Sequence, residues 1–303
     1  MSDVQYIASM SGGKDSTAMA LHLIEQDIEF DAVFLDTGWE HSAVYDYVEN
    51  DLRRILGKPV RIAEGPMPEL TPELEDLAVG FEARLGSGRK SGMIRWSLHK
   101  AMFPARVRRW CTRSLKIDAF KEVLSEYEFP VSCVGIRAKE SEARSQLPER
   151  ELSTTLDCMV WRPIIDWSKD DVIAIHQRHG IAPNPLYLRG ADRVGCWPCI
   201  FSKKSEVRFM ADQDPDRIDL IRDLEVVVTD LHYERIKKKG KEVDPSWMAT
   251  WFASRAGQKN TIDKVVEWSK TRRGGTQMTM FREDEIVPGC VEWGLCDTGS
   301  AHG

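Results

Sequence analysis

Apolar and polar positions alternate in short blocks along the first 64 residues of the chain. Residues 4–9, 30–38 and 58–64 form brief strand-like runs, whereas 16–26 and 41–57 carry apolar residues at helical spacing. The order strand, helix, strand, helix, strand predicts a parallel sheet with right-handed crossovers. We therefore expect an α/β fold with a parallel sheet flanked by helices.

The stretch 65–110 interrupts this pattern with several prolines and is interpreted as a helical or loop insertion that borders the site. The pattern resumes with a helix at 114–127, a strand at 130–137, a strand-like run at 158–167 and a helix at 168–180. Ser168 is the expected N-cap of the last helix, with two aspartates in its first turn.

The character of the chain changes after residue 199. Charged helical segments then alternate with tryptophan-containing stretches, and the tail is rich in glycine. We therefore predict two parts, an α/β domain at 1–200 and a mainly helical region at 201–303.

Length and composition restrict the class of protein. The chain has 303 residues and a net charge of −6, and it contains no apolar run near the length of a membrane span. Its first ten residues lack the basic and apolar regions of a secretory signal. We expect a cytoplasmic protein without a membrane partner, in which the seven cysteines do not form a disulfide framework.

One stretch departs from the acidic average. Residues 84–116 carry ten Lys or Arg and no Asp or Glu. A solvated helix face usually mixes both signs, so this stretch is interpreted as a surface that faces an anion.

The six residues at 11–16, Ser-Gly-Gly-Lys-Asp-Ser, lie between the first strand and the first helix. Such a turn exposes backbone N–H groups at a helix N-terminus, and glycines let an anion approach them. A lysine and hydroxyl groups add charge and further donors. The spacing excludes a Walker A loop. We predict a phosphate or pyrophosphate site made by Ser11, Gly12, Gly13, Lys14, Asp15 and Ser16, with Lys14, Asp15 and Ser16 as the catalytic candidates.

Polar residues follow two other strands at the edge where open α/β sheets place their ligands. The predicted nucleotide-binding residues are Asp36, Thr37 and Gly38 after the second strand, and Gly135, Arg137, Glu140 and Arg144 after another. Arginine forks suit phosphate or sulfate oxygens. The alternatives are an ordinary turn for the first group and Glu–Arg pairs on a helix for the second.

Three cysteines are spaced like metal ligands. Cys111 precedes the Cys-x-x-Cys pair Cys196 and Cys199 by 85 residues, and the tail supplies Cys290 and Cys296. Thiolates that converge from separate elements are typical of a [4Fe–4S] cluster or of tetrahedral zinc. The remaining two, Cys133 and Cys158, lie in predicted strands and are expected to be packed core thiols.

The loop resembles the pyrophosphate loop of the PP-loop ATP pyrophosphatase superfamily. The segments FLDTGWEHSAVYDYV, RWCTRSLKIDAF, GIRAKESEAR and NPLYLRGADRVGCWPC resemble the phosphoadenylyl-sulfate (PAPS) reductase-like family. This resemblance implies an adenine nucleotide α-hydrolase-like, Rossmann-like fold that binds an adenylyl group with its phosphates on the Gly-Gly loop. It also implies ATP with Mg²⁺, which Asp15 would help to position.

The resemblance leaves the chemistry open between two enzymes. The favoured one cleaves ATP to AMP and pyrophosphate and adenylates an acceptor for iron–sulfur-dependent sulfur transfer, as in sulfurtransferase-type members. The other is a PAPS or adenylyl-sulfate reductase that releases sulfite. Assimilatory reductases carry a Glu-Cys-Gly-Leu/Ile-His block, whereas this tail has EWGLCDTG. A non-catalytic nucleotide sensor or adaptor is the third alternative.

The resemblance also bears on the metal and the partners. Cluster-binding relatives have adjacent cysteines at the first position, whereas Cys111 lies between Trp110 and Thr112. The fourth ligand is therefore expected from the tail, with Cys296 preferred over Cys290 and zinc as the alternative metal. The expected partners are an adenine nucleotide, an anionic acceptor such as nucleic acid, a sulfur donor such as a cysteine desulfurase, and a second copy of the chain.

Overall fold

The computed structural model of the chain describes residues 4–252, 259–271 and 293, and its centre is a six-stranded sheet. The strand order is β3-β2-β1-β4-β6-β5. The pairings are parallel from β3 through to β6, and β5 pairs antiparallel with β6. The strands are β1 (Gln5–Met10), β2 (Phe30–Asp36), β3 (Arg61–Glu64), β4 (Pro130–Val134), β5 (Arg150–Ser153) and β6 (Cys158–Trp161).

This topology confirms the predicted Rossmann-like parallel sheet and fixes where a ligand can bind. The chain runs from β1 outward to β2 and β3, and then crosses to β4 on the other side of β1. The order therefore reverses between β1 and β4, and open α/β sheets bind ligands at the carboxyl ends of the strands at such a point. The Gly-Gly loop follows β1 at this position.

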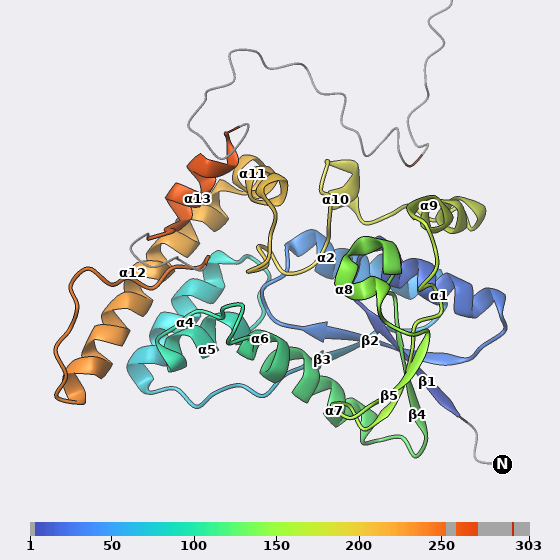
Figure 1. Cartoon of the computed structure of the whole chain (residues 1–303), viewed down its shortest axis with the longest axis horizontal. Helices are drawn as coiled ribbons and strands as arrows, with labels where there is room; N and C mark the ends of the chain where they lie inside the picture. The colour runs from blue at the N-terminus through green and yellow to red at the C-terminus, as the bar shows by residue number, and fades with distance from the viewer. Residues whose placement is uncertain (1–3, 253–258, 272–292, 294–303) are drawn as a thin grey trace, which may run out of the picture.

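Helices lie on both faces of the sheet. Figure 1 shows α1, α2 and α9 above the sheet and α7 below it, with α4, α5, α12 and α13 in a separate helical half. The α-helices of the sheet half are α1 (Lys14–Glu25), α2 (Ser42–Asp46), α3 (Arg53–Leu56), α6 (Trp110–Thr112), α7 (Asp118–Leu124), α8 (Glu142–Ser145), α9 (Lys169–Arg178) and α10 (Pro185–Leu188). Those of the helical half are α4 (Pro72–Arg84), α5 (Gly92–Lys100), α11 (Lys204–Gln213), α12 (Pro215–Lys238) and α13 (Ile262–Ser269).

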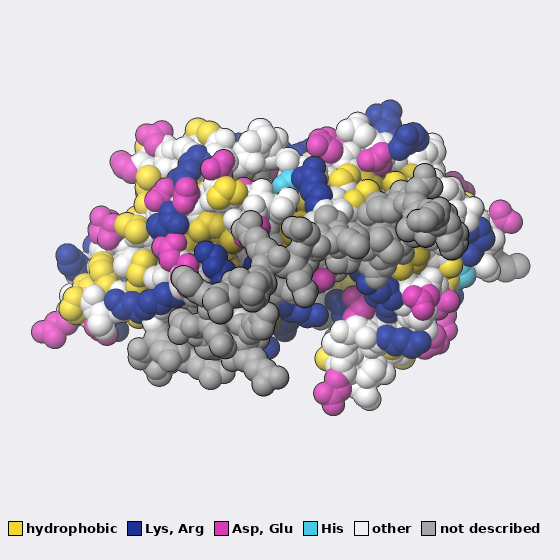
Figure 2. All heavy atoms as spheres, turned by 90° about the horizontal axis from the view of Figure 1, so that it is seen from above, with side chains coloured by type: hydrophobic (Ala, Val, Ile, Leu, Met, Phe, Trp, Pro, Cys, Tyr) yellow, Lys and Arg dark blue, Asp and Glu magenta, His cyan; other side chains and the backbone are white. Residues whose placement is uncertain are grey.

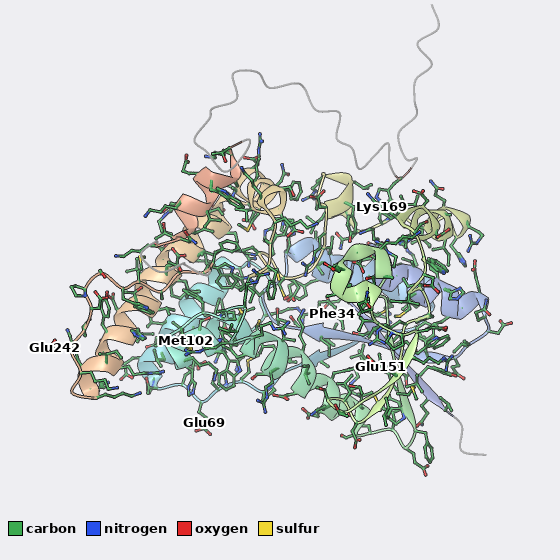
Figure 3. All side chains as sticks on the ribbon, in the orientation of Figure 1. Phe34, Glu69, Met102, Glu151, Lys169 and Glu242 are labelled. Carbon is green, nitrogen blue, oxygen red and sulfur yellow. The ribbon has the colours of Figure 1, made fainter. Side chains whose placement is uncertain are left out.

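Each face of the sheet has its own core because side chains alternate along a strand. On β2, Phe34 packs with the helices above the sheet, whereas Val33 belongs to the core below it. Figure 3 labels Phe34 on the sheet and Met102 among the helices of the other half. Ile7 on β1 packs below the sheet with Phe120 of α7.

The insertion at 65–110 and the C-terminal helices share a third core. Trp251 stacks on Trp39, which follows β2, with the ring centroids 4.6 Å apart. Around this pair lie Phe81 of α4, Ile94 of α5 and Leu224 of α12. Of the two alternatives, helix or loop, the insertion therefore contains the helices α4 and α5, and it packs against the C-terminal region. The division near residue 200 stays a prediction.

Several predicted elements differ in detail from the structure, among them the second helix and the last strand of the sheet. The helix expected at 41–57 contains a π-helical segment, η1 (Tyr47–Leu52), between α2 and α3, and it ends at Gly57 in the left-handed conformation. The strand expected at 158–167 ends at Trp161, because Pro163 cannot donate a further backbone hydrogen bond. Two more short helical segments are η2 (Arg113–Ile117) and η3 (Ala138–Glu140).

In the ranges that the structure describes, no helix combines the length and the apolar character needed to cross a membrane. Ser168 caps α9 as predicted, because its hydroxyl accepts the backbone N–H of Asp171.

Candidate functional site

The Gly-Gly loop has a backbone that requires glycine. Gly12 has φ +69°, and a Cβ there would lie 2.9 Å from Cγ1 of Val44. A Cβ on Gly13 would lie 3.2 Å from the hydroxyl of Tyr187. The sequence therefore places glycine where the chain must turn tightly against neighbouring elements.

Hydroxyl groups brace the loop from inside. The Ser16 Oγ accepts the backbone N–H of Ser11 at 3.1 Å and donates to the carbonyl of Gly13 at 3.0 Å. The Ser11 Oγ in turn accepts the N–H of Gly13 at 3.3 Å. Both serines hold the shape of the loop, and Ser16 is buried. The predicted phosphate contacts of these hydroxyls stay a prediction.

Three charged side chains meet at the start of α1. Lys14 Nζ lies 3.2 Å from Asp15 Oδ2, and Arg137 Nε donates to Asp15 Oδ1 at 2.5 Å. Arg137 comes from the segment after β4, so the reversal of strand order brings the two sequence-predicted groups together. The side chains of Lys14, Asp15 and Arg137 are largely buried. They form a compact cluster with two cations and one carboxylate.

The other predicted residues of this segment act mainly within the protein. A Cβ on Gly135 would lie 2.6 Å from the carbonyl oxygen of Asp15, so glycine lets the end of β4 pack against α1. Glu140 accepts the backbone N–H of Arg137 at 3.0 Å and pairs with Arg144. This Glu–Arg pair is the alternative that the helical spacing allowed. Direct contacts of these residues with a nucleotide stay a prediction.

The residues after β2 are also engaged internally. Asp36 accepts hydrogen bonds from the N–H of Gly38 at 2.7 Å and from the Tyr45 hydroxyl at 2.9 Å, and Arg89 pairs with it at 3.2 Å. Burial raises the pKa of Asp36 to about 6, and the neighbouring Glu40 adds to the shift. Gly38 has φ +65°, and a Cβ there would clash with the backbone of residues 90 and 91.

Two residues at the loop were missed by the sequence analysis. The Tyr187 hydroxyl accepts the backbone N–H of Lys14 at 3.3 Å, and Lys14 Nζ lies 5.0 Å from the centre of the Tyr187 ring. Asn184 Nδ2 donates to the carbonyl of Gly12 at 3.2 Å. Both belong to the segment NPLYLRG, which carried the resemblance, but their contacts depend on the placement of α10.

The five described cysteines fall into two groups. Cys133 and Cys158 are buried in the sheet, as predicted, and burial raises the pKa of Cys133 to about 12. Burial raises the pKa of Cys111 on α6, and a thiolate at the nearby Cys199 adds to the shift; the raised pKa of Cys196 likewise has contributions from Cys199 and Cys111. The structure therefore brings together the three cysteines that the sequence analysis selected.

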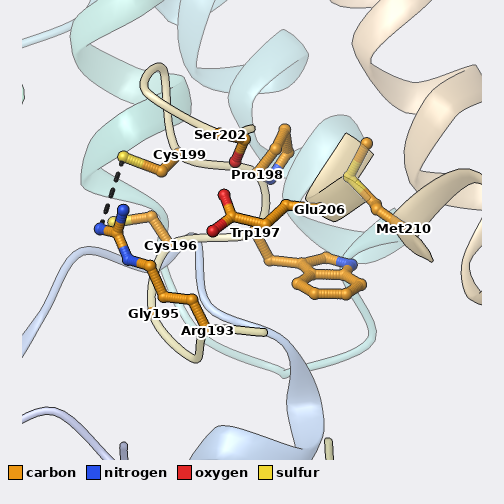
Figure 4. A pocket seen from close by; sticks show the side chains of 9 residues that line it. All are labelled: Arg193, Gly195, Cys196, Trp197, Pro198, Cys199, Ser202, Glu206 and Met210. Atoms are coloured by element: carbon orange, nitrogen blue, oxygen red, sulfur yellow. Dashed lines mark hydrogen bonds between the residues drawn. The ribbon is translucent and has the colours of Figure 1, made fainter. Parts of the chain in front are cut away.

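A loop between α10 and α11 carries Cys196 and Cys199. The pocket beside it is lined by Arg193, Gly195, Cys196, Trp197, Pro198, Cys199, Ser202, Glu206 and Met210. In Figure 4 the sulfur of Cys199 and the guanidinium of Arg193 lie on one side of the loop. The guanidinium donates a hydrogen bond of 3.9 Å to this sulfur. The indole of Trp197 points the other way, toward Met210.

Two cations face the thiols. The Arg193 guanidinium donates a hydrogen bond to Cys199 Sγ. The Lys116 ammonium lies beside Cys196 and interacts with the charge of Glu40. The pKa of Lys116 is raised, chiefly by the charge of a Cys196 thiolate, and burial opposes this shift. Burial raises the pKa of Cys196 to about 12, and Lys116 opposes this shift. Both cations therefore lie beside the thiols of Cys196 and Cys199.

Whether a metal can bind here depends on the side chains that could act as ligands, the thiols of Cys111, Cys196 and Cys199. A [4Fe–4S] cluster or a zinc–thiolate site takes four thiolate ligands, of which this centre supplies three thiols with two cations beside them. Within the described ranges, however, no three His, Cys, Asp or Glu side chains are arranged closely enough to hold a metal ion. The predicted fourth ligands, Cys296 and Cys290, lie outside the described residues.

Part of the acid-free stretch at 84–116 is paired with carboxylates of the protein itself, and an anion-facing role of the remaining cations stays a prediction. Carboxylates from other elements neutralise three of its ten cations, since Arg84 pairs with Asp223, Arg89 with Asp36 and Glu49, and Arg95 with Glu75 and Glu82. Lys116 faces the thiols, and Lys100 lies over the ring of Trp96 at 4.3 Å. The sequence-based interpretation was too broad, because these acidic partners lie outside the stretch, on other elements of the fold.

Comparison with known proteins gives a family and two kinds of relative. The family model described as phosphoadenosine phosphosulfate reductase domain matches residues 5–64 and 66–202. An uncharacterized 37.8 kDa protein of Escherichia phage 186 is 32% identical over 96% of each chain. The adenosine 5′-phosphosulfate reductase of Allochromatium vinosum is 34% identical over 30% of this chain and 35% of its own length.

A solved structure of similar topology is the phosphoadenylyl-sulfate reductase of Candida auris in a phosphate complex. It is 18% identical, with a TM-score of 0.45, over 63% of this chain and 81% of that one.

Proposed function

Because this chain belongs to the phosphoadenosine phosphosulfate reductase domain family, we propose that it is an enzyme that binds ATP on the Gly-Gly loop and cleaves it to AMP and pyrophosphate. The observation that supports this proposal is the cluster of Lys14, Asp15 and Arg137 at the reversal point of the sheet. Two cations beside a glycine-rich helix start form a site for the phosphate tail of a nucleotide.

In the proposed first step, an oxygen of the acceptor attacks the α-phosphorus of ATP. The bond between the α-phosphorus and its bridging oxygen to the β-phosphate breaks, and pyrophosphate leaves with the electron pair. Lys14 and the positive N-terminal end of α1 stabilise the charge that develops on pyrophosphate. Mg²⁺ bound to the phosphates supplies further neutralisation, and Asp15 is the carboxylate that would hold it.

In the proposed second step, sulfur at the oxidation level of hydrosulfide attacks the acceptor carbon. The carbon–oxygen bond breaks, and AMP leaves with that oxygen. Adenylation is required because a free hydroxyl or carbonyl oxygen is a poor leaving group. The protein that delivers sulfur, such as a cysteine desulfurase, and a homodimeric state both stay predictions.

The thiol centre is the proposed place for sulfur chemistry. Cys111, Cys196 and Cys199, with Cys296 or Cys290 as the fourth ligand, would hold a [4Fe–4S] cluster, which supplies electron transfer or a binding point for sulfide when present. Lys116 and Arg193 support this assignment because they place positive charge against the thiols. Zinc in the same four-thiolate site is the alternative.

The family membership also favours a second candidate, the reduction of PAPS or adenylyl sulfate to sulfite. This reaction needs a thiol nucleophile and two electrons from a reductant such as thioredoxin. Cys133 and Cys158 are buried in the sheet, so a nucleophile separate from the thiol centre would have to come from the tail. The tail lacks the block that assimilatory reductases use, which is why we place this candidate second.

One pair of assays separates the candidates. Anaerobically purified protein is assayed for pyrophosphate release from ATP, with and without total nucleic acid, and for sulfite release from PAPS with reduced thioredoxin. We expect pyrophosphate, loss of that activity in Lys14→Ala, and full activity in the surface control Lys121→Ala. Sulfite without pyrophosphate would establish the reductase instead. Tight ATP binding without either product would identify a nucleotide sensor or adaptor.

A further inference from the structure

Some arginines of the acid-free stretch pair with carboxylates elsewhere in the protein, but another group of its arginines has no acidic partner among the described residues. Arg106, Arg108, Arg109 and Arg113 are exposed, and none forms an ion pair with any residue that the structure describes. We call residues 105–113 the arginine loop. Its four guanidinium groups lie within eight positions of the chain, in a protein with a net charge of −6.

The arginine loop lies at the thiol centre. Its backbone closes into a tight turn through paired hydrogen bonds between Ala105 and Arg108. The turn leads directly into α6, which carries Cys111. The guanidinium of Arg106 lies 5.7 Å from the ring centre of Phe201, two residues after Cys199. The arginine loop therefore contains one of the thiols and contacts the segment that carries the other two.

The charges of this region divide into an inner and an outer set. Lys116 and Arg193 face the thiols and are available to neutralise them. The four guanidinium groups of the arginine loop are exposed to solvent. Neutralisation of the thiol centre does not account for them, so they are available to an external anion. Figure 2 shows Lys and Arg side chains near the middle of the upper face, on both sides of the atoms drawn in grey.

Apolar side chains are exposed between these charges. Val107 at the tip of the arginine loop is 91% exposed, and Phe201 beside Arg106 is 39% exposed. An exposed aromatic ring among arginines can stack with a nucleic-acid base while the guanidinium groups contact phosphates. A duplex conceals its base faces, whereas a single strand presents them. An acidic peptide would use the charges and leave the ring without a partner.

We propose that the arginine loop and Phe201 bind single-stranded nucleic acid and present it to the thiol centre. The proposal rests on the proposed function in one respect, since it names the acceptor class of that enzyme. The binding itself requires neither ATP nor metal. Arginines contact the backbone, and Phe201 stacks on a base.

The test is the binding of a fluorescent 20-nucleotide oligo(dT) by the full-length protein, measured by anisotropy at two salt concentrations. The test variant is Arg106→Gln/Arg108→Gln/Arg109→Gln. The matched control is Lys237→Gln/Lys238→Gln/Lys239→Gln, which removes the same charge from exposed lysines at the end of α12. We expect the arginine variant to bind at least about 10-fold more weakly and to lose about 2 from the slope of log K against log salt. The lysine control should stay within about 2-fold of wild type.

A second variant tests the stacking contact. Phe201→Ala should weaken oligo(dT) binding about 5-fold or more, with the salt slope unchanged, because base stacking contributes on the order of 1–3 kcal/mol. No binding by the wild type would overturn the proposal, as would equal losses in the two triple variants. Tighter binding of a duplex of the same length, or equal displacement by poly-glutamate, would overturn it too. Pyrophosphate release without oligo(dT) binding rejects this inference alone, whereas binding without any pyrophosphate rejects the proposed function.

Discussion

Glu40 and Cys196 are joined twice, through their side chains and through their backbones. The Cys196 thiol donates to Glu40 Oε1 at 3.7 Å, and the two backbones form an antiparallel bridge. Glu40 also accepts the Thr37 hydroxyl at 2.7 Å and the Tyr45 hydroxyl at 3.1 Å. This buried carboxylate therefore connects the segment after β2 with the thiol centre.

Substitution of Glu40 should lower the free energy of unfolding in proportion to the number of hydrogen bonds that are lost. Glu40→Ala leaves the donors of Thr37, Trp39 and Tyr45 without this acceptor, and we expect it to lower the free energy of unfolding by ~2–4 kcal/mol. Glu40→Gln keeps the shape of the side chain and one acceptor oxygen. It should therefore lower the free energy of unfolding by less than half as much as Glu40→Ala does. Urea unfolding measures both. The exposed control Glu49→Gln, which loses a surface pair with Arg89, should change stability by less than ~1 kcal/mol. Equal effects of the alanine variant and this control would contradict the role of Glu40.

A methyl group at Gly135 should disturb the start of α1. The Cβ would lie 2.6 Å from the Asp15 carbonyl oxygen and 2.8 Å from the Cα of Ser16, both backbone atoms that cannot rotate away. We expect Gly135→Ala to destabilise the protein by ~1–3 kcal/mol and to weaken ATP binding. Gly80 lies in an exposed turn of α4, where an added methyl group would have no neighbouring atom within 4 Å. Gly80→Ala should therefore stabilise the protein by ~0.5–1 kcal/mol. Thermal and urea unfolding of the two variants give this comparison.

The helical half contains a buried acid that should make stability depend on pH. Glu225 on α12 accepts the backbone N–H of Trp251 at 2.8 Å and that of Ile262 at 3.1 Å. Burial raises its pKa from 4.5 to about 7. Between these two values the unfolded chain releases the proton and the folded chain keeps it. The free energy of unfolding therefore falls as pH rises through this range.

Glu225→Gln should remove this part of the pH dependence. We compare the free energy of unfolding of the variant with that of wild type. As pH rises from about 4.5 to about 7, the difference should change by up to ~3 kcal/mol, because wild type loses stability and the variant does not. Urea unfolding at several pH values measures the difference. The exposed control Glu234→Gln on the same helix should follow the wild-type curve. A difference between wild type and Glu225→Gln that is constant with pH would show that Glu225 ionises normally in the folded state.

The two groups of cysteines should respond differently to substitution. Cys111→Ser, Cys196→Ser and Cys199→Ser should each lose the bound iron and the visible absorption of anaerobically purified protein. Cys133→Ser and Cys158→Ser place a hydroxyl in the sheet core, so they should lower stability but retain iron. Cys296→Ser should lose iron and Cys290→Ser should keep it. Wild-type protein that contains zinc and no sulfide would support the alternative metal, and protein with neither metal would contradict the thiol centre.

Much of the fold could be predicted from the sequence because its signals are local. The strands of the parallel sheet carry apolar residues, and caps such as Ser168 and Gly57 mark helix ends. The edge strand β5 was missed because its sequence, Arg-Glu-Leu-Ser at Arg150–Ser153, has a single apolar residue and so shows no alternation of apolar and polar positions. The π-helical segment inside the second helix has no sequence signal of its own.

The candidate site divides in the same way. Lys14 and Asp15 are adjacent within one contiguous motif, so the sequence alone selects them. Glu40, Lys116 and Tyr187 acquire their contacts only when distant segments pack together, and each could be an ordinary surface or core residue. The basic stretch shows the opposite error, since the acidic partners of Arg84 and Arg95 are contributed by other helices.

The central claim is that the Gly-Gly loop holds the phosphates of an adenine nucleotide. Calorimetric titration of wild type, Lys14→Ala and the control Lys121→Ala with ATP and with adenosine tests it most directly. We expect Lys14→Ala to weaken ATP binding at least about 10-fold, which is ~1.4 kcal/mol, and to leave adenosine binding unchanged. ATP binding that is equally tight in wild type and Lys14→Ala would contradict the claim, and so would equal affinities of the wild type for ATP and adenosine.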